Sequence, residues 1–168
     1  MNSPHELTEP KRTGLAMQGL AWVVLLAFGV YYFSGLLERQ VNPNGEVSTE
    51  YGDNGTREVT LQRNRYGHYV ANGLINGQPV TFLLDTGATG VAIPADVARR
   101  LGLRRGRAYR TQTANGVSTG YATVLDRVSV GAIELSDVQA GIAPGLNTEQ
   151  VLLGMSFLKH IEFTQRGN

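Results

Sequence analysis

A single acidic side chain stands at the end of an apolar run, where its chemistry would be unusual. Asp85 follows the apolar residues Phe82–Leu84 and precedes Thr86, Gly87 and further apolar chain. Burying an unpaired carboxylate costs several kcal/mol, so a buried Asp85 would need a partner group. A carboxylate held in this way can serve as a general acid or base, or as a nucleophile.

Two other interpretations of the Asp85-Thr86-Gly87 triplet have to be weighed. The triplet is ordinary turn chemistry, but a solvated turn does not require the apolar flanks "TFLL" and "ATGVAIP", which favour a dry interior. The pattern "DTGAT" also fits the Asp-x-x-x-Thr motif of haloacid-dehalogenase-like phosphatases. Those enzymes need a doubly wound α/β fold, a downstream lysine and magnesium-binding acids. Short strands, glycine turns and only two lysines, Lys11 and Lys159, argue against that class.

The elements around Asp85 are predicted to be strands and one short helix. The stretch "GHYVANGLINGQPVTFLLDTG" indicates two strands joined by an Asn76-Gly77 turn, with Asp85 ending the second. The stretch "PADVARRLGL" predicts a helix, because Pro94 stands near its start and Gly102 just past its end.

The second half of the sequence continues in the same way. "YRTQTANGVSTGYATV" predicts a hairpin with its tip at Asn115-Gly116, followed by another strand, a turn at Gly131 and the strand "VQAGIAP". "VLLGMSFLKHIEF" contains an apolar run, Gly154 and a short helical pattern. With 21 glycines in 168 residues, we expect residues 67–168 to form a compact, mainly β domain with one or two short helices.

The first quarter of the sequence predicts a membrane anchor. Residues 14–37 carry no charge, and a helix of that length would span roughly 36 Å at about 1.5 Å per residue. A cleaved signal peptide is the competing interpretation. Its only suitable cleavage pattern, Ala27-Phe28-Gly29, falls inside the apolar run, so we favour an uncleaved transmembrane helix.

Charges on either side of this helix predict its orientation. Lys11 and Arg12 precede the apolar run and Arg39 follows it, so residues 1–13 are expected in the cytoplasm and the rest outside it. This places the β domain in the periplasm or another extracytoplasmic space. Residues 38–66 are polar and turn-rich, and we expect them to form a flexible linker.

Composition excludes several function classes. A formal net charge of +1 argues against nucleic-acid binding. Without cysteine there is no disulfide, thiolate metal site or catalytic thiol, and the three histidines are too widely spaced to suggest a metal site or a cofactor. A local group of arginines is interpreted as a solvated helix end and loop in preference to a phosphate-binding patch. The group consists of Arg99, Arg100, Arg104, Arg105, Arg107 and Arg110.

Taken in order, four stretches resemble the retropepsin-like aspartic proteases, and specifically their membrane-anchored bacterial branch. They are "VTFLLDTGAT" with the active-site triplet, "TANGVSTGYA" at the flap hairpin, "VLLGMSFL" behind the active-site loop, and the N-terminal anchor with its linker. The resemblance implies a single-lobe acid-protease β-barrel preceded by one transmembrane helix. It also implies an endopeptidase that acts on peptides or proteins.

The family pattern assigns roles to particular residues. Because the chain has one Asp-Thr-Gly loop, the partner of Asp85 would be Asp85 of a second copy in a homodimer. Two carboxylates about 3 Å apart cannot both ionise, so they share a proton and activate water without a metal or cofactor. The implied catalytic residues are Asp85, Thr86 and Gly87, the implied substrate-binding flap is Ala114, Asn115, Gly116 and Val117, and the implied support of the loop is Leu153 and Gly154.

Further expectations concern the loop and the chain end. The Thr86 hydroxyl should bond across the dimer, and the Gly87 N–H should point at the Asp85 carboxylate. Ala88 stands where pepsin-like enzymes carry serine, which removes a donor to the charged form, so we expect activity at milder acidity. After "IEFTQRGN" a further strand would be expected; its absence would weaken dimerisation unless the anchor concentrates the copies.

One alternative to the protease and one extension of it stay open. An exported, anchored β domain of the same fold could bind peptides or a protein partner without hydrolysing them. Against this, a pure binder has no reason to keep a buried charged triplet. The extension is self-processing, in which the protease cleaves its own linker at residues 38–66.

Overall fold

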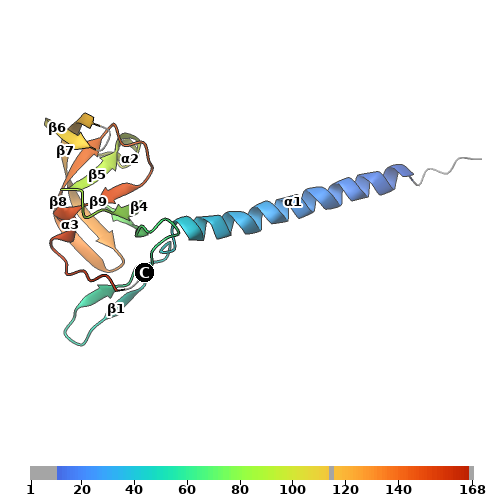
Figure 1. Cartoon of the computed structure of the whole chain (residues 1–168), viewed down its shortest axis with the longest axis horizontal. Helices are drawn as coiled ribbons and strands as arrows, with labels where there is room; N and C mark the ends of the chain where they lie inside the picture. Colours follow the sequence, from blue (N-terminus) through green and yellow to red (C-terminus); the bar gives the residue numbers. More distant parts are fainter. Residues whose placement is uncertain (1–10, 114–115, 167–168) are drawn as a thin grey trace, which may run out of the picture. The chain divides into compact units, whose positions relative to one another are not determined.

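The chain divides into two units, which we describe separately. In the computed structural model, residues 11–113 and 116–166 are described. The first unit is Met1–Glu38 and the second is Arg39–Asn168 (Figure 1).

Helix α1 (Lys11–Val41) contains the predicted apolar segment. Residues Ala16–Val41 are long and apolar enough to cross a membrane, with a mean hydropathy of 2.0 in the most apolar window and no residue of that window buried. A helix that is apolar on all its faces is typical of a membrane span or of the core of a large protein. The predicted N-terminal apolar helix is therefore confirmed at the level of length and composition.

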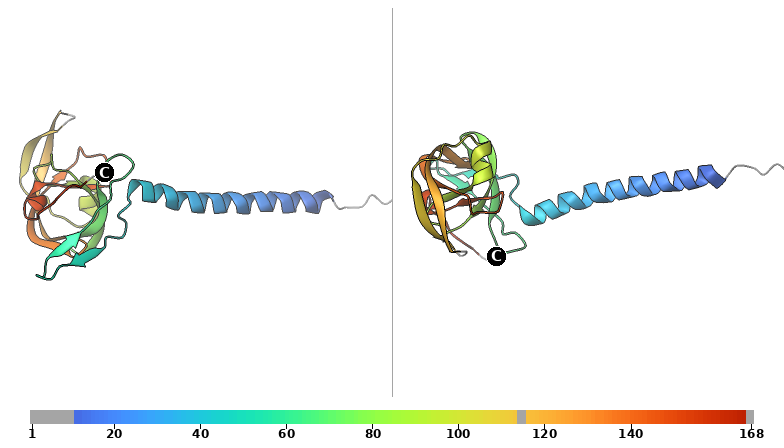
Figure 2. Two further views of the ribbon diagram at one scale, coloured as in Figure 1. Left: turned by 60° about the horizontal axis from the view of Figure 1, so that its bottom comes forward. Right: turned by 90° about the horizontal axis from the view of Figure 1, so that it is seen from above.

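The second unit is built on one seven-stranded sheet of the described residues (Figure 1). Its spatial order is β3-β4-β9-β5-β8-β7-β6, and β3 also pairs with β7. That extra pairing closes six strands into a barrel and leaves β6 on the outside (Figure 2). The strands are β3 (Val70–Ile75), β4 (Gln78–Leu84), β5 (Val91–Pro94), β6 (Ala108–Thr113), β7 (Gly116–Val130), β8 (Ile133–Ala143) and β9 (Val151–Leu153).

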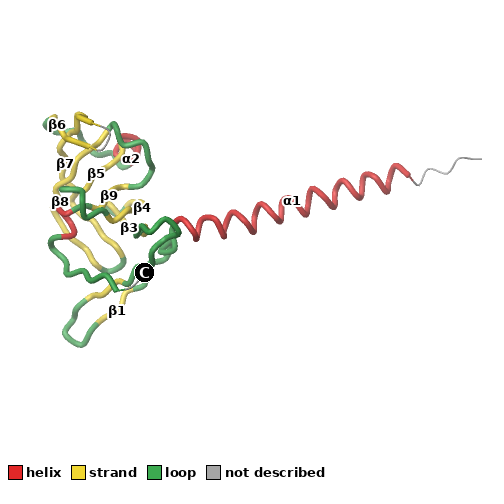
Figure 3. Tube along the Cα trace, in the orientation of Figure 1, coloured by secondary structure: helices red, strands yellow, loops and turns green. Residues whose placement is uncertain are grey.

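Most strand pairs in the barrel are antiparallel, and two are parallel. β4 runs parallel to β9, and β5 runs parallel to β8. Only two short helices, α2 (Ala95–Arg100) and α3 (Met155–Leu158), accompany the described sheet (Figure 3). This is a mainly β architecture, as predicted, and it lacks the doubly wound parallel sheet that the phosphatase interpretation requires.

The core of the barrel consists of alternating strand residues and one side of each short helix. Phe82, Ile93 and Leu125 are completely buried, and Phe157 of α3 is 1% exposed. Successive strand residues point to opposite faces, so alternate positions such as Val80 and Phe82 of β4 enter the core. The burial of large side chains here contributes about 1.5–3 kcal/mol each.

Local predictions for the turn and the first short helix are confirmed. Asn76 and Gly77 have φ values of 50° and 78°, as a two-residue type I′ turn requires, and they connect β3 to β4. Helix α2 begins directly after Pro94, and Gly102 adopts a φ of 66° just beyond its end.

The flap hairpin differs from the prediction in its register. Thr113 of β6 pairs with Gly116 of β7, so Gly116 begins a strand and is not part of a turn tip. Asn115, the other predicted tip residue, lies outside the described residues. From Gly116 the chain continues as one strand to Val130, which joins two predicted strands into one.

The expected flexible linker at residues 38–66 is also corrected by the structure, because parts of residues 42–66 are held against the barrel. Asn44 is 5% exposed, and its backbone forms an isolated parallel bridge with Ala71 at the start of β3. Its side-chain Nδ2 donates to the carbonyls of Gln62 (2.9 Å) and Val70 (2.7 Å), and its Oδ1 accepts from the Gln62 N–H (2.7 Å). One side chain thus satisfies three backbone groups, which stabilises a segment that has few apolar residues.

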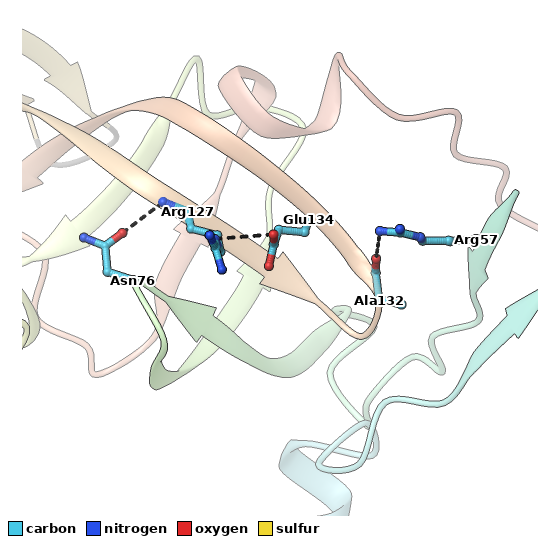
Figure 4. Close-up of polar contacts among 5 residues, drawn as sticks. All are labelled: Arg57, Asn76, Arg127, Ala132 and Glu134. Carbon is cyan, nitrogen blue, oxygen red and sulfur yellow. Dashed lines mark hydrogen bonds and ion pairs between the residues drawn. The ribbon is translucent and has the colours of Figure 1, made fainter. Parts of the chain in front are cut away.

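A small hairpin within the same segment is fixed to the turn between β7 and β8. Strands β1 (Thr49–Tyr51) and β2 (Arg57–Val59) pair with each other. The Arg57 guanidinium donates to the carbonyl of Ala132 at 2.9 Å (Figure 4), and the Ala132 N–H donates to Thr49 Oγ1 at 2.9 Å. The segment predicted as a linker therefore belongs to the second unit, whose folded part begins at Arg39.

Candidate active site

The loop that carries Asp85 begins where β4 leaves its parallel partner β9. Leu84 is the last residue in register, opposite Leu153. The Asp85 N–H then donates to the carbonyl of Leu153 at 3.2 Å, which extends the ladder by one bond. The backbone of Asp85 is therefore held by the sheet, while its side chain lies in the loop.

Within the loop, the carboxylate is held by the backbone that follows it. The Gly87 N–H donates to Asp85 Oδ1 at 2.9 Å, as predicted, and the Ala88 N–H donates to the Asp85 carbonyl at 3.2 Å. A Cβ on Gly87 would lie 3.2 Å from Asp85 Oδ1, closer than most such contacts. Glycine at this position allows the tight turn that orients the carboxylate.

Gly154 supports the loop from below by close backbone packing. A Cβ at this position would come within 2.6 Å of the Ala88 carbonyl oxygen and would also clash with Gly90. The next residue, Met155, donates its N–H to the same Ala88 carbonyl at 2.9 Å. Leu153 is 1% exposed. The structure thus brings the two predicted support residues into contact with the Asp85 loop.

Ser156 is a supporting residue that sequence reasoning missed. Its Oγ accepts the Val91 N–H at 2.9 Å and donates to the Gln139 carbonyl at 2.7 Å. One hydroxyl therefore ties α3 to the start of β5 and to β8, and so fixes the far end of the loop. A serine two residues after a glycine carries no recognisable sequence signal for this role.

The exposure of the triplet differs from the expectation of a dry interior. Asp85 is half-buried, and Thr86 and Gly87 are exposed. Phe82 is fully buried, but Leu83 and Leu84 are only half-buried, because the strand leaves the core at its end. The apolar approach therefore carries the carboxylate to the rim of the barrel and not into its centre.

The flap hairpin is present, although its predicted residues are only partly described. Ala114 and Asn115 lie outside the described residues; Gly116 has a φ of 106°, and the Val117 side chain is 58% exposed. β7 pairs with β8, and β8 pairs with β5, the strand that follows the Asp85 loop. The hairpin and the loop thus belong to one continuous sheet.

Metal ligation finds no support in the described part of the chain. Among residues 11–113 and 116–166, no group of three or more histidine, cysteine, aspartate or glutamate side chains could hold a metal ion.

A closed barrel with one Asp-Thr-Gly loop, supported by a parallel strand and a glycine, defines a single-lobe acid-protease fold. Residues 71–160, more than half of the chain, match the family described as "gag-polyprotein putative aspartyl protease". The chain belongs to this family of retropepsin-like aspartic proteases.

Two uncharacterized bacterial proteins are similar to this chain in sequence. A protein from the cobV 5′ region of Sinorhizobium is 30% identical over 144 residues, covering 84% of this chain and 59% of the relative. A protein of Rickettsia prowazekii is 28% identical over 156 residues, covering 88% of this chain and 64% of the relative. The chain therefore spans about three-fifths of the length of the curated relatives it matches.

A solved structure also supports the fold. The crystal structure of a retropepsin-like aspartic protease from Rickettsia conorii superposes with a TM-score of 0.54 at 29% identity. The match covers 64% of this chain and 90% of that protein. The predicted retropepsin-like β fold is therefore confirmed.

Proposed function

We propose that this protein is a membrane-anchored aspartic endopeptidase whose active site forms between two copies. The observation that carries the proposal is the single Asp85 loop, built as in an acid-protease fold and located at the rim of the barrel. One loop supplies one carboxylate, and water activation by this chemistry requires two. A two-fold homodimer supplies the second carboxylate from the same residue of another copy.

The chemistry follows from two carboxylates that share one proton. The ionised carboxylate takes a proton from a water molecule, which attacks the carbonyl carbon of the peptide bond. The protonated carboxylate donates a hydrogen bond to the carbonyl oxygen and stabilises the tetrahedral intermediate. Collapse of the intermediate transfers a proton to the leaving nitrogen and releases two peptides. With Ala88 in place of a hydroxyl donor, we expect this to occur at milder acidity than in pepsin-like enzymes.

Thr86 and Gly87 are proposed to position the carboxylates. The Gly87 N–H already holds one oxygen of Asp85. The Thr86 side chain is exposed, and its hydroxyl has no hydrogen-bond partner within the part of the chain that is described. It is therefore available to bond with the loop of a second copy and to keep the two carboxylates coplanar.

We propose that residues 14–37 of α1 span the bilayer. In this arrangement residues 1–13 lie in the cytoplasm and the protease domain lies outside it, in the periplasm of a bacterium with two membranes. Confinement to one membrane raises the effective concentration of copies, which favours a dimer with a modest interface. The flap around Gly116 and Val117 would close over the bound peptide.

The proposal is tested by Asp85→Asn in the full-length protein, reconstituted in liposomes. Because the amide cannot act as a general base, cleavage of an unfolded protein substrate should fall by at least about 100-fold. Unfolding by denaturant should be unchanged, which serves as the control for folding. In mixed dimers formed with excess Asp85→Asn protein, the activity per wild-type copy should also fall; activity per copy that is independent of the mutant would contradict the shared site.

A binding protein without catalysis is the second candidate, and one observation favours it. Asp85 is half-buried within one copy, so its charge can be retained without a catalytic reason. If the wild-type protein cleaves no unfolded substrate between mildly acidic and neutral pH, and both wild type and Asp85→Asn bind the same peptides, this candidate replaces the protease.

A further inference from the structure

One region of the barrel is strongly and uniformly basic. Between Asp96 and Asp126 the sequence contains six arginines and no acidic residue. The segment covers α2, the following loop, β6 and the first two-thirds of β7. The protein's net charge of only +1 therefore conceals a local concentration of positive charge.

Three of these arginines make contacts within the barrel. Arg99 forms an ion pair with Asp96, and Arg100 donates to the Pro79 carbonyl at 3.2 Å. The guanidinium of Arg105 stacks 5.0 Å from the centre of the Tyr121 ring. The side chains of the others have no ion pair or hydrogen bond among the residues that the structure describes; these are Arg104, Arg107 and Arg110.

Beside these arginines lies a groove of about 610 Å³. Its lining includes Arg104 and Arg105, together with Asn76 of the turn between β3 and β4, Thr123 of β7 and Gln139 of β8, which carry amide and hydroxyl groups. The Oδ1 of Asn76 is occupied by the Arg127 N–H, which fixes this part of the lining (Figure 4). No residue of the Asp85 loop lines the groove, so it is separate from the candidate active site.

We propose that this groove is a docking site for an acidic stretch of the polypeptide substrate, outside the segment that is cleaved. The inference rests on the proposed protease function. Guanidinium groups pair with Asp and Glu carboxylates, and amide and hydroxyl side chains bond with the peptide backbone. β7 carries both Thr123 and the flap hairpin, so a docked substrate would lie along the strand that closes over the active site.

An acidic polypeptide fits the groove better than other anions do. A bilayer surface is flat and extended, whereas the polar groups of Thr123 and Gln139 lie within a concave site. Asp126 also lines the groove and would repel the closely spaced phosphates of a nucleic acid. A flexible peptide can place its carboxylates near the arginines and keep them away from Asp126.

The first test measures binding apart from catalysis. The full-length Asp85→Asn protein in nanodiscs of neutral lipid is titrated into a fluorescent Glu-rich peptide and, separately, into its Gln-substituted version. Because the variant removes two exposed ion pairs to the peptide, Arg104→Ala/Arg105→Ala should weaken Glu-peptide binding by about fivefold. Asp126→Asn should strengthen binding, and added salt should weaken it.

The matched control removes the same charge elsewhere on the second unit. The double variant Lys159→Ala/Arg166→Ala alters two exposed basic residues that do not line the groove. It should bind the Glu-rich peptide as Asp85→Asn alone does. Equal weakening by both double variants would show a general charge effect and would overturn the groove as a site. If the protein does not bind the Glu-rich peptide in neutral nanodiscs, and Arg104→Ala/Arg105→Ala instead weakens its binding to vesicles of anionic lipid, the groove would be a membrane contact and the peptide assignment would be overturned.

The second test uses an active protein and two substrates that share one cleavage sequence. One substrate carries a Glu-rich extension, and the other carries a Gln-rich extension. Wild type should show a lower KM for the acidic substrate at equal kcat, and Arg104→Ala/Arg105→Ala should remove that difference while cleaving the Gln substrate normally. Equal KM values in wild type would overturn the docking site. Failure to cleave either substrate would instead contradict the proposed protease function. The binding test would still show whether the groove binds an acidic peptide.

Discussion

At the scale of single residues, the Asp85 loop depends on two glycines with different roles. Gly87 allows its N–H to reach the Asp85 carboxylate, and Gly154 allows β9 to pass under the loop. Neither glycine has a positive φ, so neither is required for backbone conformation. A Cβ on Gly154 would clash with backbone carbonyls, whereas one on Gly87 would only crowd Asp85 Oδ1 at 3.2 Å. A substitution at Gly154 therefore tests packing alone.

We expect Gly154→Ala to destabilise the protein by about 1–3 kcal/mol, because the new Cβ would clash with fixed backbone carbonyls. The Asp85 loop would be displaced, so cleavage of substrate should also fall. Gly90→Ala is the matched control in the same loop, since its Cβ would have no neighbour closer than 3.7 Å. Urea unfolding measures both changes; equal stability of the two variants would contradict the packing role of Gly154.

At the scale of elements, the segment before the barrel is the main difference between expectation and structure. Residues 42–66 contain a polar, turn-rich sequence, yet the segment is held by side-chain bonds to backbone groups. Asn44 is the most buried of these side chains. These contacts restrain part of the segment that the self-processing hypothesis assumed to be flexible, and that hypothesis stays a prediction.

We expect Asn44→Ala to loosen this segment selectively. The change leaves the Gln62 N–H and the Val70 carbonyl without their partner, at a cost of about 1–3 kcal/mol. Limited proteolysis should then cleave within residues 45–62 much faster than in wild type. Asn54→Ala, in the exposed turn between β1 and β2, should leave the cleavage rate unchanged. Equal protection of the Asn44 variant and wild type would show that other contacts hold the segment.

At the scale of the whole molecule, the proposed membrane helix and the single Asp85 loop are related through dimerisation. The described chain carries a helix apolar enough to cross a membrane and a barrel with one Asp-Thr-Gly loop. Confining copies to a bilayer can bring two loops together without a large dimer interface. The membrane would then contribute to assembly as well as to location.

We therefore expect the second unit alone, residues 39–168, to lose specific activity on dilution. The full-length protein in liposomes should keep its activity at the same dilution, because its copies remain concentrated in the membrane. Activity per chain measured over a hundredfold range of concentration distinguishes the two, with circular dichroism as the control that residues 39–168 remain folded. A diluted soluble domain with constant activity per chain would contradict an obligatory dimer.

The amino-acid sequence by itself determined the features that depend on near neighbours. The Asn76-Gly77 turn, helix α2 between Pro94 and Gly102, and the apolar helix are all specified by residues within a few positions of one another. The Asp85 triplet and the strand before Gly154 could be recognised for the same reason. Backbone preferences and hydrophobic patterns depend on residues that are close together in the sequence.

The tertiary structure alone decided the features that depend on distant partners. The pairing of β3 with β7 closes the barrel, Asn44 binds residues 18 and 26 positions away, and Ser156 joins two strands. Burial and exposure follow from such contacts, which is why Asp85 lies at a rim and why the basic residues border a groove. A sequence pattern shows which side chains are apolar or charged, but the packing of remote segments determines which of them meet water.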